Sequence, residues 1–245
     1  MFLIVVAITV AGAVLAWVAQ ASRTPLAYAG VFVFVIAGWI VSLCLHEFGH
    51  AFTAWRYGDH DIAVRGYLTL NPFKYANPVL SLGLPVLITL LGGIGLPGGA
   101  VWVRTSFMTD RQKTIVSLAG PFMNVVLAVV LLVVTRLCFD SDHAVFWAAM
   151  AFLGFLQITG ALLNLLPVPG LDGYGALEPH LSPETRRALE PAKQWAFFIF
   201  LLLFIATPLN QYFFAVVGWF FDLSGVNSNL IGIGFGLTRF WSAWL

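Results

Sequence analysis

Charged side chains are scarce in this sequence. Of its 245 residues, 9% are Asp, Glu, Lys or Arg and 60% are hydrophobic. About a quarter of the residues of a soluble domain are charged, so this composition excludes an ordinary soluble protein and indicates a polytopic membrane protein with little mass outside the bilayer. The formal net charge is only +1. We therefore expect no nucleic-acid partner, because no basic stripe is present to neutralise phosphates.

Cysteine is also rare. The two cysteines, Cys44 and Cys138, both lie in apolar stretches, so a disulfide framework is not expected and neither residue indicates a redox compartment. We interpret both as small buried hydrophobic residues.

Long apolar runs make up much of the sequence. Their lengths approach the roughly 20 residues that a membrane-spanning helix needs, and they lie at 2–20, 27–55, 114–138, 144–167 and 192–222. The last run is interrupted by Pro208. No Lys or Arg precedes the first run, which favours a retained membrane helix over a signal peptide. The pattern predicts an all-α polytopic membrane protein with about 5–6 transmembrane helices, forming a single domain over residues 1–245.

The sequence between the second and third runs is of a different kind. Residues 62–70 and 100–103 are rich in residues that favour strands, and 79–96 is apolar but contains Pro85 and several glycines. These features predict a small membrane-associated β-hairpin or sheet together with a re-entrant segment.

The second apolar run contains a metal-binding pattern, in LCLHEFGHAFTAW. His46 and His50 are four residues apart and so share a helix face, while Glu47 is adjacent and can reach a metal-bound water. This is the H-E-x-x-H arrangement in which glutamate acts as general base. The number expected by chance in this composition is about 0.002. A pair of structural histidines beside a glutamate is the alternative, but ionisable groups at bilayer depth are costly without partners.

A catalytic zinc site needs a third protein ligand and one open position. Among the carboxylates after Glu47, only Asp172 directly follows an apolar run and lies among turn residues. The prolines before it end the helix and Gly173 permits a tight turn, so this carboxylate can project back into the bundle.

Three ordered segments resemble the signatures of the site-2 protease family of intramembrane zinc metalloproteases (peptidase family M50). They are HEFGH, then Gly120-Pro121-x-x-Asn124, then Asn164-Leu-Leu-Pro167 followed by Leu171-Asp172-Gly173. The resemblance covers residues 43–173 and corresponds to a minimal form without PDZ or CBS domains. It implies one Zn²⁺ per chain held by His46, His50 and Asp172, with Glu47 as catalytic base. It also implies that Asn124 positions the substrate or its scissile carbonyl, although asparagines also join packed helices without catalytic duty.

The resemblance implies a zinc-dependent intramembrane metalloendopeptidase for regulated intramembrane proteolysis. The expected substrate is a single-span transmembrane protein, such as a membrane-bound transcription regulator or anti-sigma factor, cleaved within or near its helix. The resemblance also implies a location in a prokaryotic plasma membrane. The alternatives are a catalytically silent family member, or a zinc-containing membrane scaffold or transporter. A CAAX-type protease would use E-x-x-x-D, which the later glutamates do not form.

Topology constrains this hypothesis. The ends of the second and fourth runs must lie on the same side for one ion to contact all three ligands, so 79–96 must turn back without crossing. Most cationic residues then collect on one side, leaving Arg23 and Arg136 on the other. The positive-inside rule makes the first side cytoplasmic, which places the active site towards the cytoplasm and the N-terminus inside.

Overall fold

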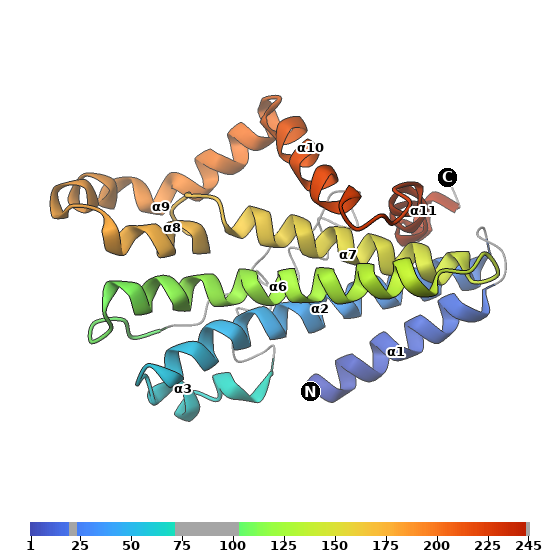
Figure 1. Ribbon diagram of the computed structural model, residues 1–245, viewed down its shortest axis with the longest axis horizontal. Coiled ribbons are helices and arrows are strands. Elements are labelled where there is room, and N and C mark those ends of the chain that lie inside the picture. The colour runs from blue at the N-terminus through green and yellow to red at the C-terminus, as the bar shows by residue number, and fades with distance from the viewer. Residues whose placement is uncertain (20–23, 72–102, 244–245) are drawn as a thin grey trace.

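The computed structural model describes residues 1–19, 24–71 and 103–243, and these ranges contain helices but no strand (Figure 1). The α-helices are α1 (Phe2–Val18), α2 (Pro25–Arg56), α3 (Asp61–Val64), α6 (Asp110–Cys138), α7 (Ala144–Asn164), α8 (Asp172–Leu177), α9 (Pro183–Ala206), α10 (Leu209–Asp222) and α11 (Asn229–Thr238). Short 3₁₀ helices are η1 (Tyr67–Thr69), η3 (Glu178–His180) and η4 (Phe240–Ala243). The all-α class predicted from the sequence is confirmed for these residues.

Three of the described helices are long and apolar enough to cross a membrane: α2, α6 and α7. They correspond to the second, third and fourth apolar runs. The helices α1 and α11 are apolar but shorter. The expected total of about 5–6 spans stays a prediction.

The long helices α2, α6 and α7 pack side by side, and α1 lies against α2 (Figure 1). Small residues allow this last contact. A Cβ on Gly12 would lie 2.4 Å from the backbone nitrogen of Phe34, and one on Gly30 would lie 2.5 Å from that of Ala16. Close backbone approach at small residues is the usual way in which helices pack in lipid.

The strand predicted over 62–70 is wrong. Asp61–Val64 is one turn of α-helix and Tyr67–Thr69 is 3₁₀. The helical turn buries Ile62 completely while Val64 is 89% exposed, and Gly66 then adopts a positive φ of 76° that an extended strand does not permit. The β-type residues here fit a half-buried helical turn because strand preference depends on a pairing partner. The re-entrant segment predicted over 79–96, and all but Val103 of the predicted strand 100–103, lie outside the described residues.

Candidate metal centre

The three predicted ligands converge on one point. His46 and His50 lie one turn apart in the second half of α2, and Asp172 is the first residue of α8. The His46 and His50 Nε2 atoms are 3.1 Å apart. Asp172 Oδ2 lies 3.2 Å from His46 Nε2, and Asp172 Oδ1 lies 3.3 Å from His50 Nε2. Within the described residues, these are the His and carboxylate side chains grouped closely enough to hold a metal ion.

These separations fit a tetrahedral zinc site. With metal–ligand bonds of about 2.0–2.1 Å, tetrahedral geometry separates neighbouring ligand atoms by roughly 3.3 Å. Asp172 Oδ2 is buried and accepts no hydrogen bond in the described structure. A buried carboxylate oxygen without a donor is costly, and a cation at this point removes the cost.

The other ring nitrogens of both histidines already have acceptors. His46 Nδ1 contacts the Asn124 side-chain oxygen at 2.5 Å, and His50 Nδ1 contacts the Val116 carbonyl at 2.7 Å. An acceptor on Nδ1 requires the hydrogen there, so the Nε2 lone pairs face the Asp172 carboxylate. This outer-shell arrangement is the one that orients imidazole ligands for a metal.

The Gly-Pro-x-x-Asn segment forms the wall opposite α2. Val116, Gly120 and Asn124 are spaced four residues apart on α6 and therefore share a face. A Cβ on Gly120 would lie 2.2 Å from His50 Nε2 and 2.6 Å from His46 Nε2, so only glycine leaves room for the site. Pro121 lies within α6 and has no N–H to donate to the preceding turn.

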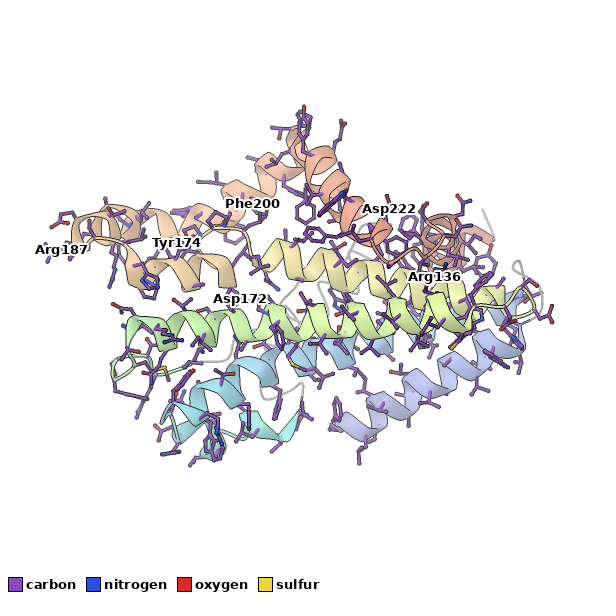
Figure 2. All side chains as sticks on the ribbon, viewed as in Figure 1. Arg136, Asp172, Tyr174, Arg187, Phe200 and Asp222 are labelled. Carbon is purple, nitrogen blue, oxygen red and sulfur yellow. The ribbon has the colours of Figure 1, made fainter. Side chains whose placement is uncertain are left out.

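The turn between α7 and α8 aims Asp172 at the histidines. Gly170 has a φ of 99°, a value that favours glycine. A Cβ on Gly173 would lie 2.2 Å from the Leu165 carbonyl oxygen, so this glycine lets α8 start directly against the end of α7. Figure 2 shows Asp172 at the start of α8, where that helix faces α6.

A cavity of about 730 Å³ adjoins the three ligands. Glu47 lines it and is only 3% exposed. Asn124 and Asn164 also line it, so the structure brings every residue of the predicted site to one cavity.

Sequence reasoning missed Ser42 and Gln157, which are buried near the site. A polar side chain inside an apolar span is a signal that it has a partner or a function, and this signal was available for Gln157. Its partners could not be deduced, because they lie on other helices.

The fold and site thus define a membrane protein with a buried two-histidine, one-carboxylate metal centre. Comparison with known proteins identifies the class further. The chain is 67% identical to "Putative zinc metalloprotease Rip2" of Mycolicibacterium smegmatis and 65% identical to the protein of that name in Mycobacterium tuberculosis, each over 99% of this chain and 94% of the relative. It is 34% identical to "Putative zinc metalloprotease YwhC" of Bacillus subtilis, over 71% of this chain and 80% of the relative.

No protein-family profile and no solved structure matches the chain. The identity to Rip2 extends over nearly the whole of both proteins, and it agrees with the three signature segments and the geometry that they adopt. The chain belongs to the site-2 protease family of zinc metalloproteases.

Proposed function

We propose that this zinc metalloprotease hydrolyses a peptide bond within or near the transmembrane helix of a single-span membrane protein. The observation that carries the proposal is the convergence of His46, His50 and Asp172 on a cavity that Glu47 also lines. The ligands and the glutamate lie on or beside helices that are apolar enough to span a membrane, so the chemistry is expected at membrane depth.

The proposed mechanism assigns proton transfer to Glu47. His46, His50 and Asp172 would hold the zinc ion, which would act as a Lewis acid and lower the pKa of a bound water. Glu47 accepts a proton from the attacking water as its oxygen adds to the scissile carbonyl carbon. The C–N bond then breaks, and Glu47 gives the proton to the leaving amine, so that one water is consumed for each peptide bond cleaved.

One asparagine is a candidate to contact the substrate, and a second is a candidate to support a metal ligand. Asn164 lines the cavity that the metal ligands border, and its side-chain amide can donate to the oxygen on which negative charge develops. The role expected for Asn124 at the scissile carbonyl stays a prediction. Its amide oxygen and nitrogen already contact His46 and Gln157, which favours a role behind the metal ligand.

We further propose that the site faces the cytoplasm of a prokaryotic cell. Cationic residues lie at the helix ends near the site: Arg56 ends α2, Lys113 lies in the first turn of α6, and Arg186 lies near the start of α9. Arg136 lies in the last turn of α6, at its other end. Figure 2 shows Arg187 and Arg136 towards opposite ends of the molecule. An excess of Lys and Arg marks the cytoplasmic side of a membrane protein.

The test of the function uses purified protein in lipid vesicles with a single-span substrate protein. We expect cleavage that a chelator abolishes and that added zinc restores, with the cut mapped by mass spectrometry to the membrane-spanning segment or its border. The Asp172→Asn variant, purified in parallel, controls for contaminating proteases. Cleavage that resists the chelator, or equal cleavage by Asp172→Asn, would refute the proposal. A scaffold or transporter would show no zinc-dependent cleavage at all.

A further inference from the structure

A continuous chain of buried hydrogen bonds leads away from the metal centre. The His46 Nδ1 contacts Asn124 on α6 at 2.5 Å, and the Asn124 side-chain nitrogen donates to the Gln157 side-chain oxygen on α7 at 2.8 Å. Gln157 Nε2 donates to Ser42 Oγ on α2 at 3.0 Å, and Ser42 Oγ donates to the Trp39 carbonyl at 2.7 Å. The chain therefore leaves α2, crosses α6 and α7, and returns to α2 one turn before His46.

The end of this chain fixes its direction. A backbone carbonyl can only accept, so the single Ser42 hydrogen is given to Trp39, and Ser42 must accept from Gln157. Gln157 then presents its oxygen to Asn124, and Asn124 presents its oxygen to His46. Each amide can therefore take only one orientation, and the hydrogen of a neutral His46 ring must be on Nδ1.

We propose that Gln157 and Ser42 are positioning residues for the metal centre, which act through Asn124 to hold His46 with its Nε2 lone pair towards the ion. The proposal rests on the proposed function for the identity of the metal, and it deepens the account of that site. Of these side chains, only His46 is one of the metal ligands. The others are therefore expected to act on the orientation and the tautomer of the His46 ring. Residues behind metal-bound histidines raise affinity in this way.

Burial makes the hydrogen bonds of this network costly to break. Gln157 is completely buried, and Asn124 and Ser42 are 7% and 5% exposed. Thr159, two residues further along α7, is also buried but donates to the Phe155 carbonyl of its own helix. Helix α7 thus carries one buried polar residue that belongs to the hydrogen-bond network, Gln157, and one that does not, Thr159. Substitutions at these two positions can be compared directly.

The first measurement is the zinc dissociation constant of the folded protein by competition with a chromogenic chelator. Outer-shell substitutions weaken metal binding by about 10–100-fold. We expect that range for Asn124→Leu, about tenfold for Gln157→Met, and a smaller loss for Ser42→Ala. Ser42→Thr keeps the hydroxyl and should restore near-wild-type affinity, and Thr159→Val should leave it unchanged.

The second measurement reads the tautomer directly, by ¹⁵N NMR of zinc-free protein labelled at histidine. His46, assigned with a His46→Gln variant, should show a protonated Nδ1 in the wild type and a mixture of tautomers in Gln157→Met or Ser42→Ala. If these residues only hold the helices together, the substitutions would lower thermal stability and leave both the zinc dissociation constant and the NMR spectrum unchanged.

The outcomes separate this proposal from the previous one. Tight zinc binding by the wild type with unchanged binding and an unchanged tautomer in Gln157→Met and Ser42→Ala would overturn the positioning role. Equal losses in Thr159→Val would also overturn it, because they would show a general packing defect. A wild-type protein that binds no zinc would instead refute the proposed function.

Discussion

At the scale of single residues, Glu47 is expected to have a different role from the two neighbouring histidines. It lines the cavity that the ligands border, but it is not among the grouped ligands. Its removal is therefore expected to stop proton transfer without emptying the metal site.

The Glu47→Gln variant tests this separation. We expect the cleavage rate to fall by about 10²–10⁴-fold, the usual contribution of a positioned acid–base group, while the zinc content stays at the wild-type level. Cleavage rate and zinc content by atomic absorption are the measurements. Glu190→Gln is the matched control, because Glu190 is exposed on α9 and outside the cavity. Wild-type cleavage by Glu47→Gln would exclude it as the base.

Residue spacing explains why most of the site was predictable. On a helix, a separation of four residues places His46 and His50 on one face whatever the rest of the fold does. Asp172 could be selected because it is a carboxylate in a turn after an apolar run. Gln157 and Ser42 escaped prediction because their contact joins residues 115 positions apart, and only the packing of α2 against α7 brings them together.

At the scale of helices, α6 makes room for the metal ligands by having a glycine at position 120. The absence of a side chain at Gly120 makes the space in which the two Nε2 atoms and the carboxylate meet. The signature segment Gly120-Pro121-x-x-Asn124 is thus one wall of the metal centre, with a gap at one turn and a hydrogen-bond acceptor at the next.

A methyl group at position 120 should fill that gap. We expect Gly120→Ala to weaken zinc binding by at least about tenfold, since its Cβ would lie 2.2 Å from His50 Nε2. The measurement is zinc affinity by chelator competition. Gly160→Ala is the matched control: Gly160 lines the same cavity, but a Cβ there would meet its neighbours at 3.8 Å or more. Equal affinity in the two variants would contradict the described wall.

The contact between α1 and α2 gives a prediction about stability. Gly30→Ala should destabilise the protein by about 1–3 kcal/mol, as overpacking usually does, because the new Cβ would meet the α1 backbone at 2.5 Å. Denaturation in mild detergent measures this. Gly218→Ala, where a Cβ would meet nothing within 4 Å, should be neutral or slightly stabilising. Equal stability of wild type and Gly30→Ala would show that the helices do not pack this closely.

Helices were easier to predict than what connects them. Apolar length alone indicated α2, α6 and α7, since a bilayer demands internally satisfied backbone over about 20 residues. The segment at 62–70 was misread because β-type residues there have no partner strand among the described residues. A buried Ile62 and a glycine with positive φ make a helical turn instead.

At the scale of the whole molecule, the proposed orientation places the end that carries Arg187 in the cytoplasm. Cys138 ends α6 and is exposed, so the interpretation of this cysteine as buried is wrong. Arg187 lies towards the opposite end of the molecule (Figure 2). A membrane-impermeant maleimide should label Cys138 in intact cells. Arg187→Cys, in a Cys138→Ala background, should react only after lysis. The reverse labelling pattern would invert the proposed orientation.

X-ray absorption at the zinc edge tests whether His46, His50 and Asp172 hold one zinc ion. We expect a four-coordinate shell with two imidazoles and otherwise oxygen, at about 2.0–2.1 Å, and a loss of bound zinc or an altered shell in Asp172→Asn. Sulfur at about 2.3 Å, or a spectrum that Asp172→Asn leaves unchanged at full zinc occupancy, would contradict it.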